Sequence, residues 1–285
     1  MDRAWATFRK WGSPRLIAAP MVDASELPFR MLARKYGAQL CYTPMINVGS
    51  FVRSKEMRKS VDEDLNDADH PVIVQLCGHD IDLLLETAES VQSRCDAIDL
   101  NLGCPQKIAK RGFYGAFLME DADLVRKIVS TLSARLRVPV TCKIRVFDDE
   151  ARTIKFAKML QDSGCQMLVV HGRTKEMIRQ ESRGVDFEII KKVKQALDIP
   201  VISNGGIETF DDIQECLKIT GTDGVMVAEG LLANPGIFSD DKIECERETT
   251  MKRFALAFDY LDFAERYPPS MGIVRGHVVK MLYQL

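Results

Sequence analysis

The sequence predicts an α/β fold, a (β/α)8 TIM barrel followed by a small C-terminal helical domain. Short apolar runs rich in β-branched residues recur along the first four fifths of the chain, and segments with helical periodicity lie between most of them. The strands follow one another at intervals of about 25–40 residues, which is typical of a parallel sheet. Eight such units predict a closed barrel.

The runs that we predict as strands are residues 16–21, 40–45, 72–77, 97–102, 140–145, 167–172, 200–205 and 224–229. Helical periodicity predicts helices at residues 26–37, 80–92, 121–136, 150–164, 186–197 and 209–221. The connection over residues 48–71 is polar and contains the segment DEDLNDADH, so any helix there is expected to be short. No GxGxxG motif follows the first strand, which disfavours the main alternative, a doubly wound open sheet.

Beyond residue 239 only helical patterns remain, at residues 252–267 and 271–285, and Pro268 and Pro269 separate them as a helix break. We therefore divide the chain into a barrel over residues 1–239 and the start of a helical domain over residues 240–285. The sequence stops inside an apolar helix face, so we expect this second domain to be either incomplete or shortened.

The composition is that of a soluble globular protein, with 46% apolar and 28% charged residues. The eight cysteines are scattered without a CxxC pair, which argues against zinc, an iron–sulfur cluster or a disulfide scaffold and fits a reducing compartment, the cytoplasm or the nucleus. No apolar run is long enough to span a membrane. The net charge of −2 exerts no overall attraction on nucleic acid, so any RNA binding must come from local patches.

Polar and small residues gather where the predicted strands end, and in a barrel of this kind that edge carries the chemistry. They are Pro20, Met21, Gln75, Asp99, Asn101, Lys143, Arg145, His171, Arg173 and Asn204. The period of two puts Lys143 and Arg145 on one side of their strand, and likewise Asp99 and Asn101. Such a polar ring cannot be the packed floor of a barrel, so it predicts a ligand-binding mouth.

Two glycine-rich turns follow the seventh and eighth strands, NGG at residues 204–206 and AEG at residues 228–230. Backbone N–H groups and a helix start at these two places can hold a phosphate. The alternative is that Gly205, Gly206 and Gly230 only permit tight turns. Two such turns on these two strands favour a phosphate-bearing ligand.

Lys143 and His171 have a structural and a functional interpretation each. A lysine at the end of an apolar strand is usually a surface residue whose charge reaches water, and a lone histidine is usually structural. At the mouth of a barrel, Lys143 would instead face the ligand, near the part of it that becomes anionic. His171 lies within HGRT at a strand end, where we expect ligand contact.

A third feature is the stretch DLNLGCPQKIAKRGFYGAFL, residues 99–118, where Cys104 lies just past an apolar strand and directly before Pro105. The alternative for Cys104 is a small buried hydrophobe, as we expect for Cys41, Cys142 and Cys165. The cations that follow, Lys110 and Arg111, are either an ordinary solvated loop or contacts to phosphate. The small residues Gly112, Gly115 and Ala116 would let this loop fold back.

Taken in order, the motifs APM, YTPM, VQLCG, DLNLGCP, GxYGAxL, KIR, VHGRT and SNGGI resemble those of the tRNA-dihydrouridine synthases from about Pro14 to the end. The segments SPRLIAAPMVDASELPFR, GAQLCYTPM, CPQKIAKRG and VMVAEG are most similar to the eukaryotic branch that acts on D-loop uridines 16 and 17. One GCP motif would be weak support, but eight motifs at matching strand ends are specific.

This resemblance implies an FMN-dependent oxidoreductase that reduces the C5=C6 bond of uridine in tRNA with electrons from NADPH. It implies FMN contacts from Pro20, Met21, Gln75, Lys143, His171, Asn204, Gly206, Ala228, Glu229 and Gly230. It also implies that Asn101 and Arg145 line the substrate side, that Lys110 and Arg111 meet RNA phosphates, and that Cys104 is the general acid. Hydride would pass from the flavin to C6 of the uracil and a proton from Cys104 to C5. A thiol is mostly protonated at neutral pH, as a proton donor must be.

The chain departs from the wider family at Glu229, where many members have an arginine that would contact the FMN phosphate. The start of the helical domain would be the tRNA-binding part, with tRNA as partner, no membrane and no obligate protein partner evident. Two other functions stay open: an FMN barrel reductase of a free pyrimidine or another small molecule, and a non-catalytic tRNA-binding relative.

Overall fold

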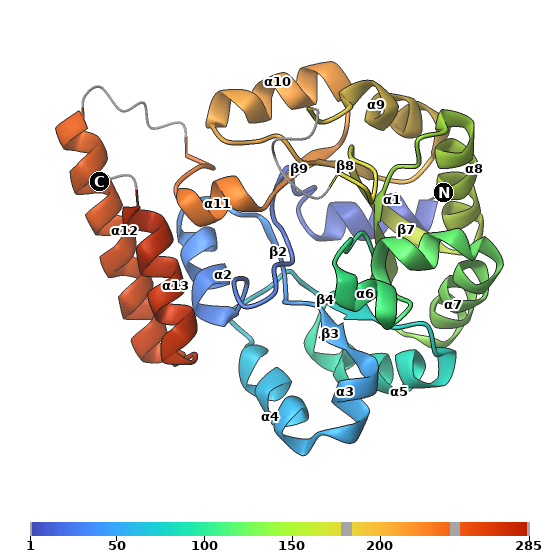
Figure 1. Ribbon diagram of the computed structural model, residues 1–285, viewed down its shortest axis with the longest axis horizontal. Helices are drawn as coiled ribbons and strands as arrows, with labels where there is room; N and C mark the ends of the chain where they lie inside the picture. The colour runs from blue at the N-terminus through green and yellow to red at the C-terminus, as the bar shows by residue number, and fades with distance from the viewer. Residues whose placement is uncertain (1, 178–183, 240–245, 284–285) are drawn as a thin grey trace.

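Eight parallel strands close into a barrel inside a layer of helices in the computed structural model, which describes residues 2–177, 184–239 and 246–283 (Figure 1). The barrel strands are β1 (Leu16–Ala18), β2 (Leu40–Tyr42), β4 (Val72–Cys77), β5 (Ala97–Leu102), β6 (Val140–Arg145), β7 (Cys165–His171), β8 (Val201–Asn204) and β9 (Gly224–Val227). Strand β1 pairs with β2 and β9, and β2 also pairs with β4, which closes the ring. The predicted barrel is confirmed, although several strands are shorter than predicted.

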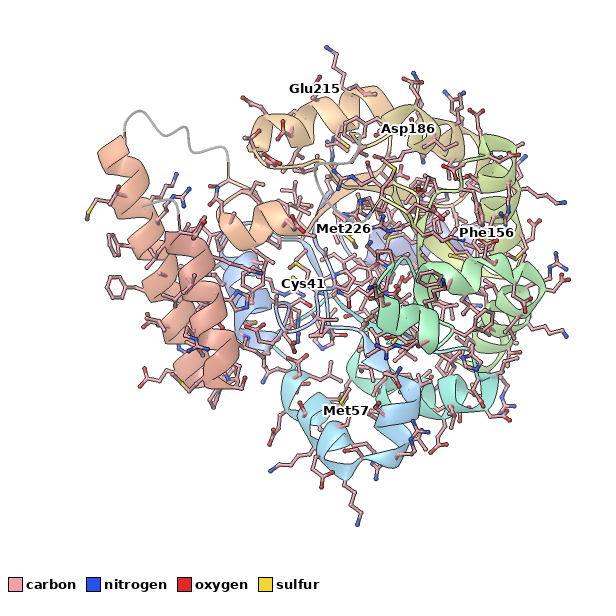
Figure 2. The ribbon with its side chains drawn as sticks, in the orientation of Figure 1. Cys41, Met57, Phe156, Asp186, Glu215 and Met226 are labelled. Atoms are coloured by element: carbon pink, nitrogen blue, oxygen red, sulfur yellow. The ribbon has the colours of Figure 1, made fainter. Side chains whose placement is uncertain are left out.

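Side chains along each strand alternate between the interior of the barrel and the helical layer. Ile73 and Met226 belong to the interior cluster, whereas Val74 and Phe156 pack in the layer between strands and helices. Figure 2 shows this difference, since Met226 lies near the centre of the ring and Phe156 in its outer layer. A strand buried on both faces is apolar throughout, which explains the continuous apolar runs in the sequence.

The six predicted helices of the outer layer are all present. They are α2 (Leu27–Lys35), α5 (Ile81–Val91), α7 (Ala122–Arg135), α8 (Glu150–Asp162), α9 (Phe187–Ala196) and α10 (Phe210–Thr220). Five of them begin after a capping side chain that accepts a hydrogen bond from the first turn, namely Asp80, Asp121, Asp149, Asp186 and Thr209. These caps explain why the periodicity placed the helix starts accurately.

The polar connection over residues 48–71 forms more helix than predicted. The short strand β3 (Ile46–Asn47) pairs with β4 and is followed by α3 (Val48–Arg53) and α4 (Lys55–Asp64). Ser54 caps α4 by accepting a hydrogen bond from Met57 N, and Val61 is its one buried residue. A helix with so narrow an apolar face leaves almost no periodicity in the sequence, which is why its ten residues were not predicted.

The first residues form a helix that closes the end of the barrel at which the strands begin. Helix α1 (Asp2–Lys10) places Phe8, with Trp11 just beyond it, in the interior cluster. The indole of Trp5 donates to Asp198 O at 2.7 Å, and Thr7 donates to Gln166 at 3.1 Å, both near the starts of strands. No element was predicted for this segment from the sequence, and its helix was missed.

Two further helices lie outside the ring, α12 (Glu246–Arg266) and α13 (Met271–Leu282), drawn in red at the left of Figure 1. Helix α12 packs on α2, and α13 packs on α12 and on α11 (Glu229–Ala233). The chain is not helical at Pro268 and Pro269, as predicted. The predicted domain boundary at residue 240 falls at a stretch outside the described residues and stays a prediction.

Candidate active site

Polar side chains from neighbouring strands line the carboxyl end of the barrel. Strand register brings them into a row, with Cα partners Gln75–Asp99, Asn101–Lys143, Arg145–His171 and His171–Asn204. Asp99 and Asn101 both hydrogen-bond Gln75, so they share the inner side of β5, as the period of two predicted. Five strands that are separate in the sequence thus contribute to one polar mouth.

A chain of hydrogen bonds crosses this row from β6 to the loop after β5. Thr141 Oγ1 donates to Asp99 Oδ1 at 2.7 Å, and Gln75 Nε2 donates to Asp99 Oδ2 at 2.9 Å. Asn101 Nδ2 then donates to Gln75 Oε1 at 2.7 Å. The oxygen of the same Asn101 amide accepts from the backbone N–H of Gly103 at 3.1 Å and of Cys104 at 3.0 Å.

The loop that carries Cys104 is held from a second side. Arg145 Nε donates to Gly103 O at 2.9 Å, and Ala116 N donates to Cys104 O at 3.0 Å. Gly115 has φ of 64°, and a Cβ atom there would lie 2.5 Å from Cys104 O. The helical turn η2 (Gly115–Glu120) therefore folds back against Cys104 only because residue 115 is glycine. The predicted use of small residues is confirmed at this position.

Cys104 differs from the other cysteines that the structure describes. Those at positions 41, 77, 95, 142, 165 and 216 are buried, whereas Cys104 is partly exposed, and all seven are free thiols. Burial raises the pKa of Cys41 and of Cys95 to about 12, which makes these thiols unreactive. The expectation that Cys41, Cys142 and Cys165 are small buried hydrophobes is confirmed.

Three cationic side chains, Lys143, Arg145 and Arg173, converge at the mouth around His171. Burial and the neighbouring Arg145 lower the pKa of Lys143 to about 8, and burial and Arg173 lower that of Arg145 to about 10. Burial, helped by the three neighbouring cations, holds the pKa of His171 well below its usual range. Asp99 acts on Lys143 only at longer range, without an ion pair. The mouth therefore holds an excess of positive charge that an anionic ligand would relieve.

Two of these side chains have buried nitrogen atoms that lack a partner among the described residues. They are His171 Nε2 and Arg173 Nε. Lys143 likewise has no hydrogen bond or ion pair within the described part of the chain. Buried polar atoms without partners are uncommon in folded proteins, so His171 Nε2 and Arg173 Nε mark a place where a ligand would bind, and the partly exposed Lys143 adds an unpaired cation there.

The guanidinium of Arg145 donates hydrogen bonds mainly to backbone carbonyl oxygens. Besides Gly103 O, it donates through Nη1 to Thr174 O at 2.6 Å and to Met177 O at 3.0 Å. It thereby joins the loop after β5 to the loop after β7 (both beside the mouth). The sequence predicted a substrate-lining role for Arg145, and this bracing role was not foreseen.

The glycine turns lie at the same edge. Gly205 has φ of 102°, and a Cβ atom there would come within 2.8 Å of the His171 ring, so the turn packs directly against that ring. Asn204 Nδ2 donates to Met226 O at 2.8 Å. Ala228 precedes α11, and Glu229, the first residue of that helix, is exposed. The tight-turn interpretation holds for Gly205, and phosphate binding stays a prediction.

The loop after β1 contributes Pro20 and Met21, both partly exposed. Ser25 fixes this loop, since its hydroxyl accepts from Met21 N at 2.9 Å and donates to Met21 O at 3.0 Å. Arg30 Nη1 in turn donates to Ser25 O at 2.7 Å. The position of Met21 therefore depends on helix α2.

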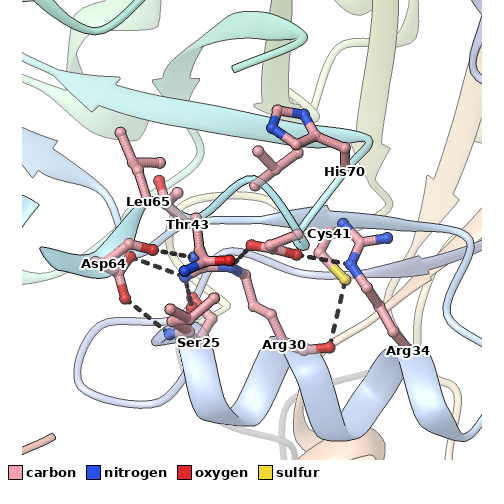
Figure 3. Close-up of polar contacts among 12 residues, drawn as sticks. Ser25, Arg30, Arg34, Cys41, Thr43, Asp64, Leu65 and His70 are labelled. Atoms are coloured by element: carbon pink, nitrogen blue, oxygen red, sulfur yellow. Dashed lines mark hydrogen bonds and ion pairs between the residues drawn. The ribbon is translucent and has the colours of Figure 1, made fainter. Parts of the chain in front are cut away.

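Arg30 is the centre of a buried ionic network that joins α2 to α4 and to the loop before β4 (Figure 3). Its guanidinium contacts Asp64 Oδ2 at 2.8 Å and Asp69 Oδ2 at 2.7 Å, and Arg34 Nε contacts Asp69 Oδ1 at 2.6 Å. The side chains of Arg30 and Asp69 are fully buried. This network could not be predicted from the sequence, because its ion pairs join residues more than thirty positions apart.

Lys110 and Arg111 lie in the last turn of α6 (Lys107–Arg111), just after the Cys104 loop. Both are exposed, and neither side chain makes a hydrogen bond or ion pair with the described residues. Two free cations beside the thiol are compatible with the predicted phosphate contacts and with a solvated surface.

Two residues that shape the mouth were not among the predicted site residues. Thr141 is the second residue of β6, where nothing in the sequence marks it. Arg173 was noted at the end of β7 but received no role. Its place within HGRT, next to His171, was the signal that could have found it.

No group of three or more His, Cys, Asp or Glu side chains is arranged for a metal among residues 2–177, 184–239 and 246–283. Within the same ranges, no helix is both long and apolar enough to cross a membrane.

The sequence matches the family described as dihydrouridine synthase (Dus) over residues 16–284. It is 46% identical over 274 residues to the mouse protein named tRNA-dihydrouridine(16/17) synthase [NAD(P)(+)]-like, a match that covers 96% of this chain and 56% of the mouse protein. It is 47% identical over 236 residues to tRNA-dihydrouridine(16/17) synthase [NAD(P)(+)] of Saccharomyces cerevisiae, covering 81% of this chain and 56% of the yeast protein. The chain thus spans little more than half the length of these relatives.

A second type of relative is the mouse tRNA-dihydrouridine(20a/20b) synthase [NAD(P)+]-like protein, 42% identical over 272 residues, with 94% of this chain and 80% of that protein covered. Among solved structures, TcOYE with pHBA is similar with a TM-score of 0.55 at 14% identity, covering 84% of this chain and 89% of that one. The YdjI aldolase from Escherichia coli K12 has a TM-score of 0.52 at 13% identity, covering 99% and 91%. These two likenesses concern the fold alone.

Proposed function

The chain belongs to the dihydrouridine synthase family, and from this premise we propose that it reduces the C5=C6 bond of uridine in tRNA, with FMN as flavin and NADPH as reductant. The observation that supports this best is the Cys104 loop, which holds a partly exposed thiol beside a cationic mouth. The names of the 16/17-type relatives favour D-loop uridines 16 and 17 as the target.

The residues at the mouth fit a flavin that carries a phosphate and gains negative charge on reduction. Lys143, His171 and Arg173 supply cationic or orphaned donor groups there. The residues that would hold FMN are Pro20, Met21, Gln75, Lys143, His171, Asn204, Gly206, Ala228 and Gly230. The carboxylate of Glu229 is exposed and would repel a phosphate, so we propose that it points away and that the family's arginine has no counterpart at this position.

When bound and reduced, FMN supplies the hydride that C6 of the uracil accepts. The part of Cys104 is to give its proton to C5 from the other face of the ring, as a general acid. Asn101 and Arg145 border the same space, and we propose that they orient the uracil. The target uridine must leave its stack to reach this mouth, which is least costly in a single-stranded loop.

RNA binding would use local cations, because the net charge of −2 provides no general attraction. We propose that Lys110 and Arg111 contact phosphates next to the target uridine and that α12 and α13 provide further RNA-binding surface. The substrate and the free thiols point to work inside the cell, in the cytoplasm or the nucleus.

The first test is dihydrouridine formation on unmodified tRNA with FMN and NADPH, comparing the wild-type chain with Cys104→Ala. We expect product from the wild type and a loss of at least 100-fold in the variant, because proton transfer by a positioned acid contributes about 10²–10⁴-fold. Cys95→Ala removes a buried thiol near the lower end of the barrel and serves as the matched control, with activity within about twofold of wild type.

Each other outcome decides against part of the proposal. Equal product from wild type and Cys104→Ala would show that Cys104 is not the acid. Reduction of free uridine but not of tRNA would identify a small-molecule reductase instead. Tight tRNA binding without flavin binding or turnover would identify a non-catalytic relative.

A further inference from the structure

The hydrogen bonds between Asp99 and Cys104 have a defined direction. At one end, a carboxylate can only accept, so the atom of Gln75 that faces Asp99 must be its amide nitrogen. At the other end, two backbone N–H groups can only donate, so the atom of Asn101 that faces them must be its oxygen. Between the ends, Asn101 Nδ2 meets Gln75 Oε1, which satisfies both requirements at once.

Both ends thus agree on one orientation of two amides. If either amide turned over, it would set nitrogen against nitrogen or oxygen against oxygen among buried side chains. Gln75, Asp99 and Asn101 are buried, with exposed fractions of 1%, 0% and 7%. The arrangement is therefore a single polar unit whose orientation is set at Asp99.

We infer that Asp99 is a positioning residue for the proposed reaction: through Gln75 and Asn101 it holds the N–H groups of residues 103 and 104, and thereby places the Cys104 thiol. Only the role of the Cys104 thiol as a proton donor rests on the proposed function. The hydrogen-bonded unit itself consists of the chain's own side-chain and backbone atoms.

The surroundings keep Asp99 able to accept at neutral pH. Burial raises its pKa to about 6, and the bonds from Thr141 and Gln75 limit the rise. A carboxylate with this pKa is mostly ionised at pH 7.5, so both of its oxygens remain acceptors there. Lys143 also favours the ionised form at longer range.

The direction of the bonds can be tested by exchanging the two ends. In Asn101→Asp, acceptors face Gln75 from both sides, and its single amide nitrogen can satisfy only one of them. In Asp99→Asn combined with Asn101→Asp, an acceptor again faces a donor at each contact, with the direction reversed. The combined variant also keeps the net charge.

The measurement is hydrogen–deuterium exchange of the Gly103 and Cys104 amides at pH 7.5 in the substrate-free protein. Pro105 has no N–H, so a short peptide across the loop reports on few other amides. We expect exchange at least tenfold faster in Asn101→Asp and within about threefold of wild type in the combined variant. The inference is overturned if the combined variant exchanges as fast as Asn101→Asp, or if Asn101→Asp exchanges like wild type.

Placement of the thiol is tested with Asp99→Leu and the conservative Asp99→Asn. Leucine removes the acceptor, whereas asparagine can keep its oxygen toward Gln75 and turn its nitrogen to Thr141. In Asp99→Leu we expect iodoacetamide to alkylate Cys104 at least fivefold faster than in the wild type. We also expect this variant to form dihydrouridine at least tenfold more slowly at saturating tRNA. Asp99→Asn should restore both within about threefold.

Thr141→Val is the matched control, because it removes a bond to the other oxygen of Asp99 and leaves the path to Cys104 intact. Its amide exchange and alkylation should stay within about threefold of wild type. If Asp99→Asn behaves like Asp99→Leu, the charge rather than the accepting oxygen matters and the inference fails. If the wild type forms no dihydrouridine, the proposed function fails, while exchange and alkylation still decide the role of Asp99.

Discussion

The charge of Lys143 in the mouth lowers the stability of the ligand-free protein and favours the binding of an anion. Lys143 is partly exposed, its charge is disfavoured by desolvation and by the neighbouring Arg145, and no acidic side chain pairs with it among the described residues. Its pKa falls from 10.5 to about 8, so in the substrate-free protein the folded state holds this proton less tightly than the unfolded chain does. Keeping Lys143 charged in the folded protein therefore lowers the free energy of unfolding at neutral pH. A bound anion would offset this loss.

The replacement Lys143→Met should stabilise the ligand-free protein and weaken flavin binding together. At pH 7 we expect an increase in the free energy of unfolding of up to about 3 kcal/mol, since one pKa unit corresponds to about 1.4 kcal/mol. The cost of Lys143 is full below pH 8, decreases as the pH rises from 8 to 10.5, and vanishes above that. The gain in Lys143→Met should shrink in the same window.

Urea unfolding at pH 7 and at pH 10, with flavin fluorescence titration at pH 7, measures both effects. Lys158→Met, on the exposed face of α8, is the control and should change stability by less than about 0.5 kcal/mol at either pH. A Lys143→Met protein that is less stable than wild type at pH 7 would contradict the assigned cost of its charge.

Among the elements, helix α2 connects the mouth to the rest of the molecule. In its first turn, the backbone N–H of Leu27 donates to Asp64 Oδ1 at 2.7 Å. Arg30 donates to Ser25 O, at the end of the loop that carries Met21. Burial raises the pKa of Asp64, although Arg30 opposes this rise. The ionic network thus fixes the loop that carries Met21.

Removing one member of this network should be costly, because it leaves buried charges unpaired. For Asp69→Ala we expect a loss of about 3–5 kcal/mol in the free energy of unfolding, since Asp69 pairs with both Arg30 and Arg34. Urea denaturation at pH 7 measures it. Glu63→Ala on α4 is the matched control, because its pair with Lys59 is exposed and spans 3.6 Å, so less than about 1 kcal/mol is expected. Similar losses in the two variants would contradict this account.

For the whole molecule, a buried carboxylate helps to fix the helices outside the ring to the barrel. Glu26 accepts from Tyr260 Oη at 3.0 Å and contacts His277 Nε2 at 3.1 Å. The His277 ring stacks on Phe29 at a centroid distance of 4.4 Å. At the rim, Asp259 contacts Tyr36 and Lys35, each at 2.6 Å. Both α12 and α13 are therefore anchored to α2.

Glu26→Ala should loosen α12 and α13 while leaving the far side of the barrel unchanged. It leaves the Tyr260 hydroxyl and the His277 ring buried without their shared partner, at a cost of about 1–3 kcal/mol for each group. We expect hydrogen exchange at least tenfold faster in α13 and unchanged in α7, and weaker tRNA binding if these helices contact RNA. The exposed Glu265→Ala on α12 is the control. Equal exchange of α13 in Glu26→Ala and wild type would show that the anchor lies elsewhere.

Much of the barrel could be predicted because its strands and helices leave local patterns. The continuous apolar runs marked β4, β5 and β6 at their observed bounds, and the helices of the outer layer were found within a few residues. Helix α4 was missed because it buries only Val61 and so lacks the repeated apolar face by which a helix is recognised. Helix α1 was missed although its apolar residues have helical spacing, with Ala4, Phe8 and the following Trp11 buried.

The location of the candidate site could be predicted from the sequence, but the hydrogen bonds that position its residues could not. Strand ends meet at one edge in any parallel barrel, so Gln75, Asn101, Lys143 and His171 could be placed together from chain order alone. Their bonding could not be predicted, and neither could the use of Arg145 to brace three backbone carbonyls. An arginine at a strand end looks the same in sequence whether it faces a ligand or a loop.

The sequence by itself determined the barrel, the edge where the polar residues gather and the place of Cys104 just beyond β5. These features depend on periodicity and chain order, which neighbouring residues decide. Only the tertiary structure decided which side chains are bonded and which charges stay unpaired, because those contacts join distant residues. Gln75 and Asp99 are 24 positions apart, and Asp99 and Thr141 are 42 apart. Burial then turns these contacts into the lowered pKa of Lys143 and the fixed direction of the bonds that reach Cys104.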